Sequence, residues 1–265
     1  MKITIIGLGQ IGGSLAWALK KNGFEVLGIS RRQKTLNRAL KLKMCDSVSD
    51  SIPKSLKSDV IILCVHIGLY KDMLLKLRYF DAIVSDVGSV KRIFYNLCTD
   101  LGIEKFVGAH PLAGAEKYGI ESSDPNLFVN SKCIISGYSD KNSLSKVEKL
   151  WRSVGAKTLI MTPSEHDEQL SYSSHLVHII SFSLARTVFP GTKLWGTSLK
   201  DMLRVSKRSP QMWADIFVAN YDFSVNAVKK FEKNLKYLKD MIKKRDNKRL
   251  AEVISSLQKN LPKDM

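Results

Sequence analysis

The sequence predicts an α/β protein in which an open, doubly wound sheet is followed by an all-helical C-terminal domain. Seven short apolar runs alternate with helix-length segments over the first 160 or so of the 265 residues. Strands separated in this way form parallel β-α-β units. After Met161 the alternation stops and the later segments have a helical period. We therefore predict one domain over 1–161 and a second over 162–265.

The predicted strands are short and nearly continuous in valine, isoleucine and leucine. Such runs are typical of strands that helices cover on both faces of a sheet. In chain order they are ITII (3–6), FEVLGI (24–29), DVIILCV (59–65), AIVSDV (82–87), KFVGAH (105–110), KCIISG (132–137) and AKTLIM (156–161).

The C-terminal part begins with its own helix signals. Thr162 is a candidate N-cap, and Pro163 fits the first turn of a helix that starts there. The helical pattern is interrupted near Pro190 and again near Pro210. We therefore expect several helices after residue 162.

Composition and the start of the chain predict a protein of the reducing cytosol. The four cysteines are far apart and form no C-x-x-C pair, which argues against a zinc site or a redox dithiol. Met1 leads directly into an apolar strand, without the three regions of a secretory leader. No apolar run approaches the ~18 residues that span a membrane. We expect a cytoplasmic protein with no membrane segment.

The formal charge of +17 raises the question of a nucleic-acid partner. Between Lys229 and Arg249, ten Lys or Arg residues alternate with apolar residues at spacings of three and four. This spacing is typical of an amphipathic helix with a solvated basic face. Because no aromatic stacking platform is interleaved with these charges, we predict attraction of small anions rather than nucleic-acid binding.

A glycine-rich turn follows the first predicted strand and opens the first predicted helix. It has the G-x-G-x-x-G spacing of a dinucleotide-binding Rossmann fold. The first glycine permits the tight turn, the second admits the pyrophosphate and the third allows close packing of helix and strand, while helix N–H groups face the phosphates. The residues assigned to the cofactor here are Gly7, Leu8, Gly9, Gln10, Ile11 and Gly12.

The end of the second strand favours NADP over NAD. An NAD enzyme normally places Asp or Glu there to hold the ribose 2′-hydroxyl, whereas this chain has Ser30. Ser30 could donate a hydrogen bond to the 2′-phosphate of NADP, and Arg31 and Arg32 could pair with it. The alternative is that both arginines begin a solvated helix. Cys64 and Val65, at the end of the third strand, are also assigned to the cofactor site.

His110 stands in the stretch VGAHPLAGAEKYG (107–119), where a catalytic role and a structural turn are both open. Histidine exchanges a proton near neutrality, which suits a general base. Pro111 favours extended backbone at His110, and Gly108 and Gly114 allow close approach of the chain to a ligand. Open α/β sheets bind ligands at the loops after their strands, such as this one and the loop at 85–91.

Five stretches, taken in order, resemble the prephenate and arogenate dehydrogenases of tyrosine biosynthesis. They are GLGQIGGSLA (7–16), SDVGSVK (85–91), GAHPLAGAEKYG (108–119), HDEQLSYSSHLVH (166–178) and DMLRVSKRSPQMWADI (201–216). Together they extend over nearly the whole chain. The family commonly has a proline after the third strand where this chain has Val65-His66, and HLPH where this chain has HLVH. These departures leave substrate choice open.

The resemblance implies an oxidative decarboxylation: hydride leaves the ring carbon that bears the hydroxyl, the ring carboxylate departs as carbon dioxide, and the ring becomes aromatic. It implies that His110 holds and deprotonates the ring hydroxyl, and that Ser89 hydrogen-bonds His110 and helps to seat substrate and cofactor. It assigns Arg204 to a carboxylate of the dicarboxylate substrate, and Glu116 with Lys117 to an ionic gate. A homodimer formed through the helical domain is also implied.

The histidines of the fourth stretch form a second constellation. His166, Asp167, His175 and His178 could meet on one face of a helix, and two histidines with an aspartate can ligate zinc. The resemblance implies instead a metal-free hydride transfer in which these residues shape the pocket, so we predict no metal and assign His175 and His178 to the substrate. His178 could hydrogen-bond a keto oxygen, which favours prephenate over arogenate.

Two other hypotheses compete with this one. A different two-domain Rossmann reductase, of the β-hydroxyacid or imine-reducing kind, would place its lysine or aspartate on the helix that links the domains, whereas this chain offers His110 in a loop. A nucleotide-sensing or nucleic-acid-binding module would need a basic groove with stacking aromatics.

Overall fold

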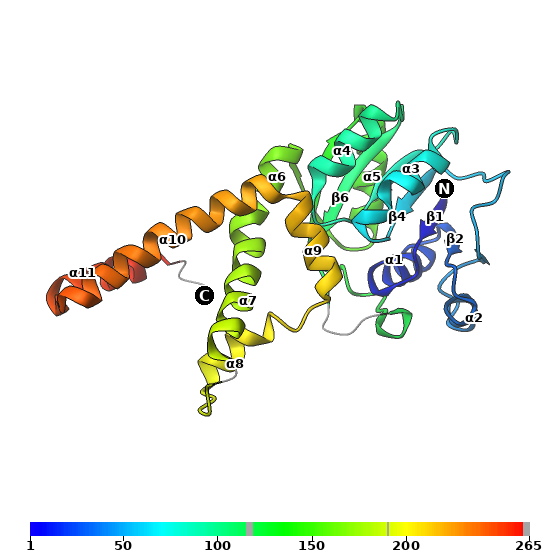
Figure 1. Ribbon diagram of the computed structural model, residues 1–265. Helices are drawn as coiled ribbons and strands as arrows, with labels where there is room; N and C mark the ends of the chain where they lie inside the picture. The colour runs from blue at the N-terminus through cyan, green and yellow to red at the C-terminus, as the bar shows by residue number, and fades with distance from the viewer. Residues whose placement is uncertain (115–118, 190, 262–265) are drawn as a thin grey trace.

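The computed structural model describes residues 1–114, 119–189 and 191–261 of the chain (Figure 1). Glu116 and Lys117, which the resemblance assigns to a gate, lie outside the described residues. Within the described ranges eight strands form one sheet, in the order β3-β2-β1-β4-β5-β6-β7-β8. They are β1 (Lys2–Ile6), β2 (Glu25–Ile29), β3 (Ser47–Ser49), β4 (Val60–Leu63), β5 (Ile83–Asp86), β6 (Phe106–Pro111), β7 (Lys132–Tyr138) and β8 (Lys157–Met161). All seven predicted runs therefore form strands.

Helices cover both faces of the sheet, which confirms the doubly wound fold. Leu15 of α1, Leu36 of α2 and Trp151 of α5 belong to the apolar core on one face. Tyr70 of α3 and Phe94 of α4 belong to the core on the other. The bounds of these helices are α1 (Gln10–Lys21), α2 (Gln33–Lys41), α3 (Tyr70–Leu77), α4 (Lys91–Asp100) and α5 (Lys141–Ser153).

Two features of the sheet differ from the prediction. The edge strand β3 is three residues long and reads SVS, so it carries no apolar run that a pattern could detect. β7 runs antiparallel to β6, whereas the sequence predicts parallel pairing throughout. The described part of the connection between them holds only the short 3-10 helix η2 (Ile120–Ser122), which is not the crossover helix that a parallel pair needs.

Beyond β8 the described chain is helical, as predicted. Its elements are α6 (Pro163–Leu170), the π-helix η3 (Ser171–His175), α7 (Leu176–Val188), α8 (Thr197–Arg204), α9 (Pro210–Ala219), α10 (Tyr221–Lys244) and α11 (Asn247–Lys259). The Thr162 hydroxyl accepts from Glu165 N at 3.2 Å, and the Glu165 carboxylate accepts from Thr162 N at 2.8 Å. This reciprocal capping box starts α6 at the predicted place.

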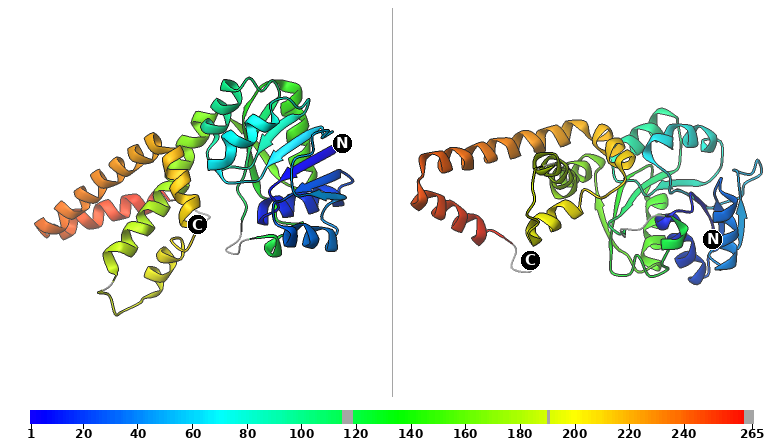
Figure 2. Two further views of the ribbon diagram at one scale, coloured as in Figure 1. Left: turned by 45° about the vertical axis from the view of Figure 1, so that its right-hand side comes forward. Right: turned by 60° about the horizontal axis from the view of Figure 1, so that its bottom comes forward.

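In the helical region, residues 162–265, few of the described side chains are buried. Ser181 is the one buried residue of α7, and the described side chains of α11 include none. Val90, Trp213 and Ile216 form a small apolar cluster that joins α9 to the start of α4. Figure 2 shows α10 reaching away from the sheet, with α11 turning back at its far end. None of the described helices combines the length and apolar character needed to cross a membrane.

Candidate active site

The glycine-rich turn between β1 and α1 has the close contacts that a dinucleotide fingerprint requires. Gly7 has φ +103°, and a Cβ there would lie 2.4 Å from the Cys64 carbonyl oxygen. A Cβ at Gly12 would lie 1.9 Å from the Gly7 carbonyl oxygen, so the helix start could not approach the turn with any larger residue. A Cβ at Gly9 would meet nothing within 4 Å. The backbone at Gly9 is therefore open to a phosphate.

Ser30 follows the last residue of β2, and Arg31 and Arg32 precede α2. The Ser30 hydroxyl oxygen lies 3.4 Å from Arg32 N, which donates to it. Both arginines are exposed. Among the residues that the structure describes, neither guanidinium has an ion-pair partner. The two cations are therefore available to an anion at the end of β2.

A cleft of about 700 Å³ opens beside the glycine-rich turn, between the sheet and α9. Its wall brings together most of the predicted cofactor residues with Ser89, His110 and His178. The residues that line it include Gly9, Gln10, Ile11, Gly12, Cys64, Val65, Ser89, His110, His178, Arg208, Trp213 and Asp215.

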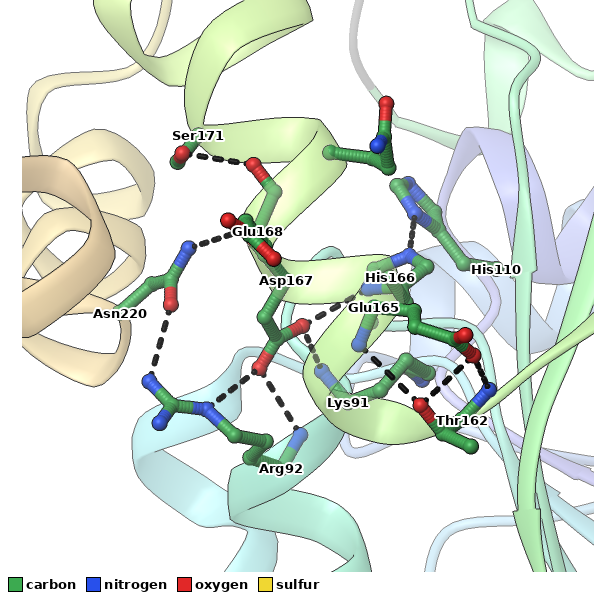
Figure 3. A network of polar contacts seen from close by, with 12 residues as sticks. Lys91, Arg92, His110, Thr162, Glu165, His166, Asp167, Glu168, Ser171 and Asn220 are labelled. Atoms are coloured by element: carbon green, nitrogen blue, oxygen red, sulfur yellow. Dashed lines mark hydrogen bonds and ion pairs between the residues drawn. The ribbon is translucent and has the colours of Figure 1, made fainter. Parts of the chain in front are cut away.

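His110 occupies β6 at the wall of this cleft, and 9% of its surface is exposed. Its Nδ1 lies 2.9 Å from Nε2 of His166 (Figure 3). The resemblance implies a hydrogen bond with Ser89, which lines the same cleft, whereas the ring contact described here is with His166. Burial, together with the nearby His166 and Lys91, lowers the pKa of His110 well below its usual value. The imidazole is therefore neutral at physiological pH.

Behind His166 the polar contacts continue to Asp167 and the start of α4. His166 Nδ1 lies 2.7 Å from Asp167 Oδ1. Lys91 N donates to the same oxygen at 2.7 Å, and Arg92 N donates to Oδ2 at 3.0 Å (Figure 3). Both histidine and aspartate are fully buried. The N-terminus of α4 thus holds a carboxylate, which its N–H groups and dipole favour.

A buried ion pair fixes the backbone next to His110. Lys91 Nζ lies 2.6 Å from Asp86 Oδ1 and donates to the Ala109 carbonyl oxygen at 2.7 Å. Asp86 also accepts from Ala109 N at 3.1 Å and from the Tyr70 hydroxyl at 2.8 Å. Both members of the pair are fully buried, so each charge depends on these partners. The arrangement holds the loop after β5 against β6.

The histidines of the fourth stretch separate in the structure. His178 stacks on Trp213, with ring centroids 3.5 Å apart, and lines the cleft. His175 is 1% exposed and is not among the lining residues; its Nδ1 lies 3.1 Å from Asn220 Nδ2. Burial lowers the pKa of His175 to about 4. Among the described residues, no three His, Cys, Asp or Glu side chains gather to hold a metal.

The two arginines of the fifth stretch also differ in position. Arg204, the predicted carboxylate ligand, ends α8, is exposed and does not line the cleft of this chain. Arg208 lies between α8 and α9, is half-buried and does line it.

Several residues of the site carry no role in the sequence analysis. They are Asp86, Lys91, Arg208, Trp213 and Asp215, together with the contact between His166 and His110. Asp86 and Lys91 both lie within the stretch SDVGSVK, so this motif could have indicated that they belong to the site. Nothing in the spacing of His110 and His166 indicates that the two rings meet, because the contact depends on how α6 packs against the sheet.

Two family models match the chain. One, described as the nucleotide-binding domain of prephenate dehydrogenase, matches residues 15–161. The other, described as the dimerization domain of prephenate dehydrogenase, matches residues 162–256.

Individual proteins are similar over nearly the full chain. A prephenate dehydrogenase of Lactococcus lactis is 31% identical over 262 residues, which are 93% of this chain and 72% of the relative. A crystal structure of prephenate dehydrogenase from A. aeolicus, in complex with hydroxyphenyl propionate and NAD+, is 33% identical, with a TM-score of 0.91 over 97% of this chain and 96% of that one. Synechocystis arogenate dehydrogenase is 28% identical, with a TM-score of 0.86 over 98% of each chain.

Proposed function

The chain belongs to the prephenate dehydrogenase family, and on that premise we propose that it oxidises and decarboxylates prephenate to 4-hydroxyphenylpyruvate in tyrosine biosynthesis. The observation that carries the proposal is the neutral, nearly buried His110 in the cleft beside the glycine-rich turn. A nicotinamide cofactor, when bound, accepts the hydride.

His110 acts as the general base. The substrate hydroxyl gives its proton to the imidazole while hydride leaves the same carbon, so that a ring carbonyl forms. Loss of carbon dioxide then delivers its electron pair to the ring, which becomes aromatic with a phenolate oxygen. The protonated His110 returns the proton to that oxygen, and the base is neutral again for the next substrate. A histidine with a lowered pKa suits this cycle because its cation gives up the proton readily.

We propose NADP as the preferred cofactor. Gly7, Gly9 and Gly12 would hold the pyrophosphate at the start of α1. Ser30 stands where an NAD enzyme normally has a carboxylate, and the exposed Arg31 and Arg32 offer charge to a 2′-phosphate. The similar A. aeolicus structure contains NAD+, so the preference proposed here depends on these three residues of this chain.

The two substrate carboxylates need fixed cations. Arg208 supports the proposal by its place in the cleft wall, where a guanidinium could bind a carboxylate through two hydrogen bonds. Arg204 is proposed from the family motif, and it stands in the same basic segment. Ser89 and His178 line the cleft and would help to orient the substrate, whereas His175 would act from behind Trp213.

Arogenate is the second candidate substrate because of Asp215. This side chain lines the cleft, where its Oδ1 accepts from Gln211 Nε2 at 2.8 Å. A carboxylate in the cleft could pair with the amino group that distinguishes arogenate from prephenate. His178, in contrast, could donate to the keto oxygen of prephenate.

The chain would work as a homodimer. Apolar side chains of the helical region are exposed in the single chain, and a matching family domain is described by its role in dimerization. They include Val177, Leu194, Met202, Val218, Leu235, Ile242, Ile254 and Leu257.

Steady-state assays of the purified chain with prephenate and arogenate, each with NAD and NADP, test the proposal. We expect the highest kcat/KM with prephenate and NADP. A higher kcat/KM with arogenate would favour the second candidate substrate. Absence of reduced cofactor with both substrates would overturn the function.

A further inference from the structure

We propose that Asp167 and His166 are positioning residues that hold His110 in a single tautomer, with a proton on Nδ1 and the lone pair of Nε2 toward the cleft. The inference rests on the proposed function only in giving the lone pair of His110 Nε2 the role of a general base. Its structural content is a fixed direction of the hydrogen bonds in a buried row of three side chains.

Asp167 sets the direction because it can only accept. Its Oδ1 accepts a hydrogen bond from Lys91 N at 2.7 Å, and its Oδ2 accepts one from Arg92 N at 3.0 Å. Arg92 Nε also lies 3.4 Å from Oδ2. Burial raises the pKa of Asp167, but the hydrogen bonds from His166, Lys91 and Arg92 outweigh it and leave the pKa below the ordinary value. An ionised carboxylate has no proton to donate. The hydrogen atom between Asp167 and His166 therefore belongs to the histidine.

His166 passes this direction on. Its Nδ1 lies 2.7 Å from Asp167 Oδ1 and carries the hydrogen between the two atoms. A neutral ring therefore has its lone pair on Nε2. Burial lowers the pKa of His166, despite the nearby aspartate, so the ring is neutral at physiological pH. Nε2 lies 2.9 Å from His110 Nδ1 and can only accept. His110 must therefore supply the hydrogen on Nδ1.

The tautomer of His110 decides whether it can serve as a base. With Nδ1 protonated, the lone pair on Nε2 can accept a proton from a ligand. With the opposite tautomer, Nε2 would present a hydrogen and could not accept one. Because the hydrogen bonds of this buried row can run in one direction only, the tautomer of His110 with hydrogen on Nε2 is disfavoured.

The charged and titratable groups around the row come from several neighbouring elements. Lys91 of α4 and Asp86 of β5 form a buried pair, Arg92 of α4 contacts Asp167, and His175 of the π-helix is neutral. The positive charge of Lys91 lowers the pKa of both His110 and His166. These surroundings disfavour a charged ring in the resting row.

Nitrogen NMR of the full chain, labelled with ¹⁵N-histidine and free of cofactor and substrate, tests the tautomer directly. The chain has five histidines, so each ring can be assigned from a single substitution. We expect His110 and His166 to carry hydrogen on Nδ1 and none on Nε2. Hydrogen on Nε2 of His110 would overturn the proposal.

Variants then test the cause. His166→Leu removes the acceptor, so His110 should become a mixture of tautomers, with kcat lowered about 10- to 100-fold. His166→Gln can return an acceptor oxygen, and it should recover part of the kcat and the single tautomer. The matched control is Asp222→Asn, which removes a different partner of Arg92 and touches neither histidine. It should leave the His110 tautomer unchanged.

The outcomes separate this inference from the proposed function. A His110 ring that keeps one tautomer in His166→Leu would show that His166 does not set it. Should His166→Leu fail to fold, the wild-type spectrum alone decides. A chain that turns over neither prephenate nor arogenate, yet shows both histidines with hydrogen on Nδ1, would overturn the function and leave the inference standing.

Discussion

The sheet region, residues 1–161, and the helical region, residues 162–265, bury their apolar side chains to very different extents. The sheet region has extensive apolar cores on both faces, and every residue of β4, β5 and β6 is buried. The small apolar cluster of the helical region includes Val90, which belongs to the sheet region. In α11, Ile254 and Leu257 are exposed. The described part of the sheet region is packed within a single chain, whereas that of the helical region leaves many apolar side chains exposed.

Both regions contribute residues to the candidate site. The cofactor turn and His110 lie on the well-packed sheet region, while the residues that contact His110 from behind and line the far wall of the cleft come from the helical region. Cofactor binding should therefore depend on the first region alone, and chemistry on both.

Replacing His110 should separate binding from chemistry most strongly. His110→Asn removes the base and is expected to lower kcat about 10²- to 10⁴-fold, the usual contribution of a general base. Cofactor affinity, measured by fluorescence titration, should stay unchanged because the glycine-rich turn is intact. An unchanged kcat would remove His110 from its proposed role.

The helical region should contribute substrate affinity through its arginines. Arg208→Gln is expected to raise the substrate KM about 10- to 100-fold, since losing a charge-assisted carboxylate contact costs about 1.5–3 kcal/mol. Arg204→Gln, assayed in parallel, should also weaken substrate binding more than cofactor binding. A substrate KM unaltered in both variants would show that neither arginine binds a carboxylate.

Burial in a second copy can be tested with a matched pair of substitutions. Leu257 of α11 is 56% exposed and Leu40 of α2 is 46% exposed in the single chain. If dimerisation covers α11, Leu257→Asp should weaken the dimer about 10-fold or more, because a buried leucine contributes about 1.5–3 kcal/mol. Leu40→Asp should not weaken it. Sedimentation at micromolar concentration measures both, and a monomeric wild type would contradict the prediction.

Cofactor choice should change through the sheet region alone. Ser30→Asp places a carboxylate where the 2′-phosphate would lie, so we expect the NADP preference of about tenfold in kcat/KM to reverse. Arg31→Ala should reduce the preference without reversing it. Raised salt should weaken NADP more than NAD by screening the arginines. Equal kcat/KM with both cofactors, unaltered by Arg31→Ala, would show that the arginines only face water.

The smallest effect concerns acid pH. The proposed base must be neutral, and burial lowers the pKa of His110 well below 6.5. As pH falls, activity should therefore persist through 6.5 and decline only as the pH passes the lower value. A free histidine, with a pKa of about 6.5, would have lost half of its neutral form there. A profile of kcat/KM against pH with its acid midpoint at 6.5 would contradict the lowered pKa of His110.

The sequence was sufficient for features that depend on local pattern. The seven apolar runs, the glycine turn and the Thr162 cap are each determined by residues close together in the chain, and all are present. The antiparallel pairing of β7 is not encoded in an apolar run, because both strand directions bury the same residues. β3 has too few apolar residues to show.

Within the site, the limit lay in contacts between distant segments. Motifs identify His110, Gly9 and Gly12, and the fold brings all three to the cleft. The sequence pattern groups His166, His175 and His178 together, yet α6, the π-helix and α7 turn them toward His110, Asn220 and Trp213 respectively. Those directions depend on tertiary packing, which spacing alone does not contain.

The row from Asp167 through His166 to His110 crosses from one region to the other, and this restricts how the enzyme can be recombined. A chimera that joins residues 1–161 of this chain to the helical region of a relative must preserve the histidine and aspartate just after the junction, as well as the α4 start that holds the aspartate. A graft that keeps the glycine turn and loses these partners would still bind cofactor. If the proposed row sets the tautomer of His110, activity is expected only in chimeras that keep these segments of the two regions together.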